Sequence, residues 1–264
     1  VLSDPSVRSS LMSGARIAAF LVAVMPSLLA ADLLPEPDAR FSEHSLQDIA
    51  LGQLLFYDPI LSGSKTVSCA TCHHPRFATG DGLSLGMGDG GVGLGPDRRV
   101  DPANPPEQRI GRNAPALFNL GAAEFTRFFH DGRLEADPSR PSGLRTPLGE
   151  DMEHGFASAL AAQAMFPVLS GDEMAGHYSE NEISQAVRLG FLSSGGGAWD
   201  LIAARVAAVT EYRAQFEVIL EPGVQIKFTD IANVIADFIA AEWRADNSAF
   251  DRYLRDGAPL DPAA

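Results

Sequence analysis

Two cysteines and a histidine form the most reactive short segment of this chain. Cys69, Cys72 and His73 lie in the stretch SCATCHHPRF, and the 264 residues contain no other cysteine. Residues three apart on a helix are neighbours on its surface, so the two thiols can face one group together. The imidazole of His73 follows directly and adds a nitrogen ligand.

Three kinds of chemistry fit this spacing to different degrees. A redox dithiol of the thioredoxin type requires a strand–helix setting, which the flanking sequence does not offer. A structural zinc site requires four ligands, and adjacent His73 and His74 cannot easily point at one ion. The C-x-x-C-H motif is typical of covalent haem c, in which both sulfurs bond the porphyrin and the histidine binds iron. We interpret Cys69 and Cys72 as haem anchors and His73 as the proximal iron ligand.

A glycine-rich loop after this motif bears on the other face of the iron. From Gly80 to Gly95 the chain reads GDGLSLGMGDGGVGLG, in which eight of sixteen residues are glycine. This density disfavours helix and strand and lets the backbone approach a flat cofactor closely. Met87 lies in the middle, where its sulfur either binds the iron or lines the pocket. A strong sixth ligand favours an electron carrier, and an open or displaceable position favours a catalyst.

The elements that position these residues are predicted to be helices joined by long loops. Apolar residues recur at helical spacing in HSLQDIALGQLLFYDP, which stops before Pro59. The stretch SALAAQAMFPV predicts a short helix that ends near Pro167. In SENEISQAVRLGFL, Ser179 is followed three residues later by Glu182, which indicates a capping box at a helix start.

The longest apolar stripe lies near the carboxyl terminus. The stretch FTDIANVIADFIAAEW has Thr229 as its predicted cap. Its apolar stripe consists of Ile231, Ile235, Phe238 and Ile239. Residues 131–155, rich in proline, glycine and charge, are expected to form a long surface connection. No run alternates over several strands, so the predicted fold class is all-α, with a cytochrome c-like haem domain.

Composition limits the classes of partner. The chain has 45% hydrophobic and 20% charged residues, which is typical of a globular protein. Its formal net charge is −14, so a nucleic-acid backbone is not an expected partner.

The amino terminus has the pattern of a secretory signal. From Met12 the chain reads MSGARIAAFLVAVMPSLLAAD, with one arginine, an apolar run from Ile17 and small residues at Ala30 and Ala31. We interpret residues 1–31 as upstream residues plus a signal peptide and expect export to the periplasm. The apolar run is short for a bilayer, so no stable membrane span is expected in the mature chain.

Several motifs, taken together, resemble the bacterial di-haem cytochrome c peroxidases and their MauG-like relatives. The resemblance runs from about Leu51 to about Leu254. The stretch LGQLLFYDPILSGSKTVSCATCH resembles the first helix and first haem motif of the family, and GRNAPALFNL its arginine–asparagine–alanine–proline signature. The stretch FFHDGR resembles its aspartate–glycine–arginine signature, FPVLSGDEMAG the start of its distal pocket, and IANVIADFIAAEWRADNSAFDRYL the helix that leads toward its second haem domain.

The resemblance implies roles for single residues. Glu173 matches the distal glutamate, which is the acid–base group for peroxide, and His73 matches the proximal ligand of the peroxidatic haem. Asn113 matches a residue that helps to bind calcium, and Arg112 and Arg133 are candidates for the haem propionates. The implied reaction is reduction of hydrogen peroxide to water with electrons from a small cytochrome or copper protein, and a homodimer is a candidate assembly.

Three departures from the family pattern leave alternatives open. The family has a second haem motif beyond the last residue here, so residues 32–245 are predicted as the peroxidatic haem domain and 246–264 as a linker to a missing second domain. His130 stands where the family has tryptophan, and Met87 stands near its displaceable distal histidine. The alternatives are MauG-like oxidation of a partner protein and electron transfer by a His73–Met87 ligated cytochrome.

Overall fold

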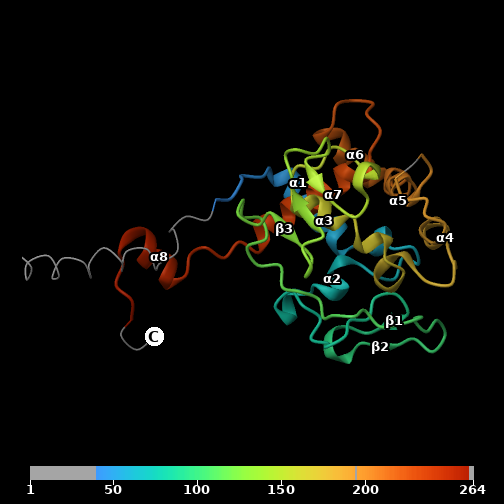
Figure 1. The fold of residues 1–264 in the computed structure, drawn as a ribbon, viewed down its shortest axis with the longest axis horizontal. Coiled ribbons are helices and arrows are strands. Elements are labelled where there is room, and N and C mark those ends of the chain that lie inside the picture. The colour runs from blue at the N-terminus through green and yellow to red at the C-terminus, as the bar shows by residue number, and fades with distance from the viewer. Residues whose placement is uncertain (1–39, 194, 262–264) are drawn as a thin grey trace, which may run out of the picture. The chain divides into compact units, whose positions relative to one another are not determined.

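The computed structural model describes residues 40–193 and 195–261, and the predicted signal peptide lies outside them. Helices predominate over short strands (Figure 1). The chain divides into two compact units. The described residues up to Ser248 form one unit, and helix α8 (Ala249–Asp256) belongs to the other. The boundaries predicted for the haem domain and the linker stay predictions.

The larger unit is built from helices and single turns. Its α-helices are α1 (Leu46–Tyr57), α2 (Cys69–Cys72), α3 (Ala159–Ala164), α4 (Glu182–Arg188), α5 (Ala198–Ala207), α6 (Thr210–Ile219) and α7 (Phe228–Glu242). Its 3₁₀ turns are Pro59–Leu61, Pro75–Phe77, Gly95–Asp97, Gly149–Asp151 and Pro167–Leu169, and a π-helical turn spans Gly171–Ala175. In the described part of the chain, no helix combines the length and apolar character needed to cross a membrane.

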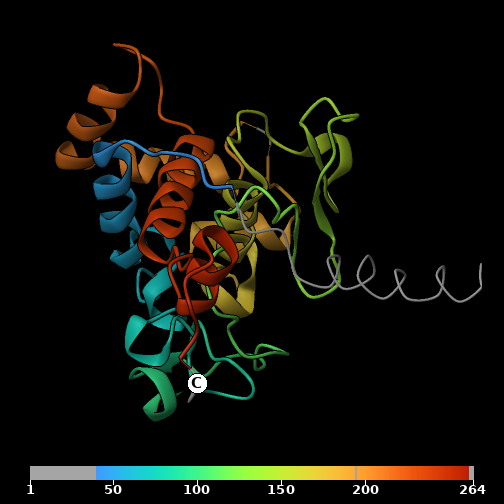
Figure 2. The same cartoon turned by 90° about the vertical axis from the view of Figure 1, so that its left-hand side faces the viewer.

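Helices α1 and α7 form the centre of the core and lie side by side (Figure 2). The predicted stripe on α7 is buried throughout, which confirms its helical spacing. Phe56 of α1 packs against Phe238 and Trp243, with ring centroids 5.3 and 5.2 Å away. The backbones approach closely at Gly52, where a Cβ atom would overlap the carbonyl group of Val234.

Two of the predicted helix caps are wrong. Helix α4 begins after Asn181, whose Oδ1 accepts hydrogen bonds from the backbone of Ile183 and Ser184, and not after Ser179. Helix α7 begins after Lys227. There the carboxylate of Asp230 accepts a hydrogen bond from the Lys227 N–H at 2.8 Å. The predicted cap Thr229 is already inside the helix.

The all-α prediction is confirmed in that helices predominate, but the structure also contains two small antiparallel sheets. Strands β1 (Gly91–Val92) and β2 (Arg99–Val100) pair at the end of the glycine-rich loop. The second sheet has the order β3 (Arg127–Phe128), β4 (Leu134–Ala136) and β5 (Leu144–Arg145).

The segment 131–155 was expected to be a surface connection, and this prediction is wrong in part. It supplies β4 and β5, and three of its apolar side chains are buried in the main core. These are Leu134, Leu144 and Met152. Strands β3 and β4 pack against α3.

The close crossing at Gly52 predicts a loss of stability when a side chain is added. Gly52→Ala should lower the free energy of unfolding by about 1–3 kcal/mol, because the obstructing atoms are backbone atoms that cannot rotate away. Thermal unfolding of the purified protein measures the effect. Gly111→Ala is the matched control, because no atom lies within 4 Å of its added Cβ. Equal melting temperatures for both variants would contradict the packing argument.

Candidate functional site

Both cysteines lie on the single helical turn α2. The backbone N–H of Ser68 donates a hydrogen bond to Thr71 Oγ1 at 2.9 Å and fixes the start of this turn. Both thiols are free and partly buried. Burial raises the pKa of Cys69 to about 12 and that of Cys72 to about 11. A redox dithiol depends on a lowered thiol pKa, so this environment disfavours the dithiol interpretation.

The imidazole of His73 is oriented by the main chain. Its Nδ1 lies 2.9 Å from the carbonyl oxygen of Thr79. Because a carbonyl only accepts, Nδ1 carries the proton and Nε2 keeps its lone pair for a metal. Burial lowers the pKa of His73, which favours the neutral ligand form. Left-handed backbone at Ala78 and Thr79 turns the chain back to deliver this carbonyl.

The GRNAPALFNL segment runs along the His73 side of the site. The backbone N–H of Leu117 donates to Thr79 Oγ1 at 2.8 Å and thereby fixes the residue that orients His73. The carbonyl of Arg112 accepts a hydrogen bond from the N–H of Gly86 at 3.1 Å. Arg112 and Asn113 are exposed, and their predicted roles toward propionate and calcium stay predictions.

The glycine-rich loop lies directly against the turn that carries Glu173. A Cβ atom at Gly88 would overlap the carbonyl oxygens of Asp172 and Glu173, so only glycine permits this approach. The N–H of Asp89 donates to the carbonyl of Glu173 at 3.0 Å. Met87 is buried, with its sulfur against Gly91. The loop that holds Met87 and the turn that holds Glu173 are therefore fixed as one assembly.

Arg98 holds this loop in shape from within. Its side chain is buried and donates to the carbonyl oxygens of Met87 and Gly88, both at 2.6 Å, and of Gly93 at 2.8 Å. Burial lowers the pKa of this guanidinium, and the nearby carboxylate of Asp89 opposes the change. Three charged hydrogen bonds to main-chain oxygens explain how a loop so rich in glycine keeps one conformation.

Electrostatics links Glu173 to the cysteine motif. Burial is the main cause of the raised pKa of Cys72, the positive charge of Arg98 lowers this pKa, and the negative charges of Asp81 and Glu173 raise it. Residues more than 100 positions apart, Cys72 and Glu173, thus belong to one site. The carboxylate Oδ2 of Asp81 is buried there without a hydrogen-bond partner among the described residues.

The carboxyl group of Glu173 has a strongly shifted pKa. Burial raises it to about 7, the charge of Arg133 partly opposes this shift, and the charge of Asp172 adds to it. Arg133 itself is exposed, pairs with Asp131 at 3.1 Å, and lies with its guanidinium carbon 3.9 Å from the centroid of the Phe129 ring. A carboxyl group that titrates near neutral pH can both accept and return a proton.

Sequence reasoning missed three charged or polar residues that shape this site. Arg98, Asp89 and His177 are almost fully buried, although charged residues usually lie at the surface. The many glycines around Asp89 were a signal that the backbone is packed closely. His130, the departure from the family tryptophan, is exposed, and His74 accepts a hydrogen bond from the Arg76 N–H at 3.1 Å.

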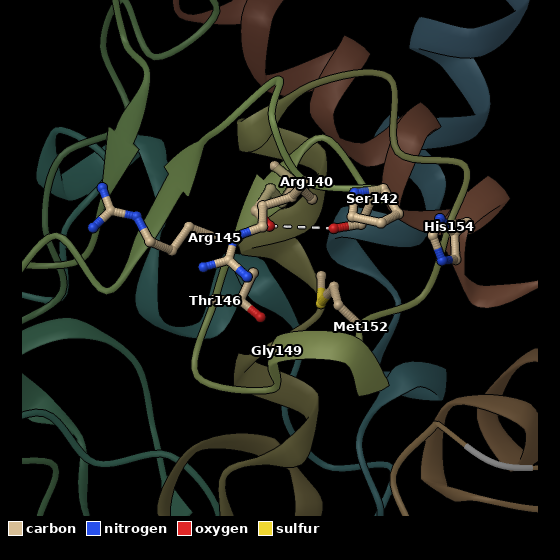
Figure 3. Close-up of a pocket in the computed structure, with 9 residues that line it drawn as sticks. Arg140, Ser142, Arg145, Thr146, Gly149, Met152 and His154 are labelled. Atoms are coloured by element: carbon tan, nitrogen blue, oxygen red, sulfur yellow. Dashed lines mark hydrogen bonds between the residues drawn. The ribbon is translucent and has the colours of Figure 1, made fainter.

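A separate small pocket lies beside strand β5 (Figure 3). Its walls include Arg140, Arg145, Met152 and His154, and Ser142 Oγ donates to the carbonyl of Leu144 at 3.2 Å. Its volume of about 50 Å³ is far below the few hundred Å³ that a cofactor or drug-sized ligand requires. It shares no residue with the assembly around Cys72 and Glu173.

Residues 46–258 match the family model of the di-haem cytochrome c peroxidases. The chain belongs to this family. Its members bind c-type haem and are oxidoreductases. The resemblance of the sequence motifs is thereby confirmed at the level of the family.

Individual relatives agree with this assignment. The chain is 39% identical over 108 residues to a cytochrome-c peroxidase IdrP2 of Pseudomonas sp. (strain SCT), covering 40% of this chain and 24% of that protein. It is 33% identical over 138 residues to the methylamine utilization protein MauG of Methylorubrum extorquens (strain ATCC 14718 / DSM 1338 / JCM 2805 / NCIMB 9133 / AM1). This match covers 52% of this chain and 28% of that protein. A crystal structure of a MauG-like protein associated with microbial copper homeostasis shares the fold, with a TM-score of 0.51 and 24% identity over 87% of this chain and 51% of that one. The chain thus spans about a quarter of these two curated relatives.

The hydrogen bonds of Arg98 predict that the glycine-rich loop depends on this side chain. Arg98→Met should lower the free energy of unfolding by on the order of 3 kcal/mol, because three main-chain oxygens lose a charged donor. Limited proteolysis within residues 86–98 should become faster. Arg99→Met, in the exposed neighbouring position on β2, is the control. An Arg98 variant as stable and as resistant as this control would contradict the assigned role.

Proposed function

We propose that this chain is the peroxide-reacting haem domain of a cytochrome-c peroxidase. The observation that carries the proposal is the assembly in which Glu173, with a pKa near 7, is fixed to a buried loop beside the Cys69–Cys72–His73 motif. The reaction is reduction of hydrogen peroxide to water, with electrons from a small cytochrome or copper protein.

The residues fit covalent haem c. Cys69 and Cys72 offer two free thiols on one turn, and His73 offers an imidazole whose Nδ1 is held by the Thr79 carbonyl and whose Nε2 could coordinate iron. Oδ2 of Asp81 is buried without a hydrogen-bond partner among the described residues. This supports the presence of a further group, such as a cofactor, in the site. When bound, haem supplies an iron centre that takes a peroxide oxygen and exchanges electrons.

The side chains of the protein contribute proton transfer to the reaction. The carboxylate of Glu173 accepts the proton from the near oxygen of hydrogen peroxide and delivers it to the far oxygen, so that water leaves instead of hydroxide. Its pKa near 7 makes both transfers accessible at neutral pH. Cys69 and Cys72 would hold the haem through thioether bonds, and His73 would bind its iron.

Further residues have subordinate roles in the proposal. Arg112 and Arg133 bind the haem propionates, and Asn113 contributes to a calcium site. Met87 would line the haem pocket without binding the iron. The chain acts after export to the periplasm.

MauG-like oxidation of a partner protein is a second candidate function, because curated relatives named MauG match the same chain.

The acid–base role predicts a pH profile with a definite sign. Glu173 must be ionised to accept a proton, so the rate constant for peroxide should rise about tenfold per pH unit below pH 7 and level off above it. Glu173→Gln should slow this reaction roughly 10²–10⁴-fold and remove the rise. Stopped-flow absorption of the haem-loaded protein measures both effects.

Asp172→Asn is the matched control, because this neighbouring carboxylate is bound by the Gln108 amide at 2.6 Å. It should retain the wild-type plateau rate within about threefold and keep the rise with pH. The midpoint of the rise should move to lower pH, because the charge of Asp172 no longer raises the pKa of Glu173. A Glu173→Gln variant that reacts as fast as wild type would refute the proposal. A low-spin haem that does not react with peroxide would instead indicate an electron carrier with Met87 as ligand.

The adjacent histidines provide a test of the proximal ligand. His73→Gly should lose the axial ligand and change the absorption spectrum of the haem, and added imidazole should restore it, because a free ligand can occupy the vacated position. His74→Gly should keep the wild-type spectrum, since His74 is engaged in the turn at Pro75–Phe77. Identical spectra for wild type and His73→Gly would contradict the assignment.

A further inference from the structure

Three side chains outside the haem motif converge on one point. Asp89, His177 and Glu180 each present one ligand atom, and these atoms all lie within 4.8 Å of one another. Asp89 belongs to the glycine-rich loop, and the other two follow the turn that carries Glu173. We propose that these three residues bind one divalent transition-metal ion of the Zn²⁺ type.

Two of the three residues are buried with an unused polar atom. Asp89 is 1% exposed and His177 is 2% exposed. In the part of the chain that the structure describes, Asp89 Oδ2 and His177 Nδ1 find no hydrogen-bond partner. Buried polar atoms are rarely left unpaired, because each costs on the order of 1–3 kcal/mol. A cation between them would satisfy both.

The other polar atoms of the three residues form hydrogen bonds that orient the ligand atoms. The amide of Asn104 donates from Nδ2 to Glu180 Oε2 at 3.0 Å, which fixes its orientation. Its Oδ1 then lies 3.0 Å from His177 Nε2 and can only accept. The proton of the imidazole is therefore on Nε2, and Nδ1 keeps its lone pair. Such orienting contacts are typical around metal-binding histidines.

Local contacts also orient the carboxylates of Asp89 and Glu180. Asp89 Oδ1 accepts a hydrogen bond from the Gly90 N–H at 2.8 Å, which leaves Oδ2 as the unused oxygen. Gly176 has a φ of +90°, and a Cβ atom built on it would lie 2.6 Å from Glu180 Oε1 and 3.0 Å from Asp89 Oδ2. Both oxygens thus converge beside this glycine.

The donor set indicates the class of ion. One imidazole nitrogen and two carboxylate oxygens suit Zn²⁺ and related first-row divalent ions, whereas Ca²⁺ takes oxygen ligands only. Three protein ligands leave a further position of a tetrahedral Zn²⁺ for water. The site shares no residue with the proposed calcium site at Asn113. Its ion would link the loop of Met87 to the segment that follows Glu173.

Metal analysis of the haem-loaded protein tests this proposal. The full chain, without a histidine tag, is freed of loose metal with a chelator, incubated with Zn²⁺ and dialysed. We expect about one zinc per chain by mass spectrometry, and a higher melting temperature with Zn²⁺ than without it. His177→Gln and Glu180→Gln should each lower the Zn²⁺ affinity at least tenfold and abolish the shift in melting temperature.

His154→Gln is the matched control, because this histidine is exposed and lies beside the small pocket at β5. It should bind zinc as wild type does. Glu180 is exposed, so its variant keeps the test valid if His177→Gln fails to fold. Wild-type protein that binds no more zinc than Glu180→Gln, or that binds Ca²⁺ but not Zn²⁺, would overturn the proposal.

Discussion

The close contact between the backbones of Gly88 and Glu173 is the constraint on which the rest of the site depends. It leaves no room for a side chain at Gly88, and the adjacent hydrogen bond from Asp89 to the Glu173 carbonyl fixes the register of the two segments. Arg98 then holds the loop from within through three main-chain oxygens. A carboxyl group whose desolvation raises its pKa to about 7 is thereby held in place, and the charge of the exposed Arg133 only partly opposes this shift.

The opposite part of the site is organised by a separate set of contacts. Thr79 orients the His73 ring through its carbonyl and is held in turn by the N–H of Leu117. The helix pair α1 and α7 provides the apolar core beside which the cysteine turn α2 lies. Two sides of one site therefore come from segments about 100 residues apart, and each side is fixed mainly by main-chain hydrogen bonds.

Periodicity and local motifs predicted part of this arrangement. The existence of α1 and the buried stripe of α7 were predicted from apolar spacing, and the C-x-x-C-H motif placed the candidate site. The cap of α4 was missed because Asn181 with Ser184 is an equally good capping pair, two residues beyond Ser179. The sheets were missed because strands of two or three residues are too short to show alternation. The burial of Arg98 and His177 depends on contacts between distant segments, which local spacing does not encode.

The proposed function requires that a haem bound at Cys69, Cys72 and His73 would place Glu173 on its other side. A crystal structure of the haem-loaded protein measures this directly. We expect thioether bonds at Cys69 and Cys72, iron coordinated by His73 Nε2, and the Glu173 carboxyl group on the side of the haem away from His73. A Glu173 side chain on the His73 face, or one turned into solvent, would contradict it.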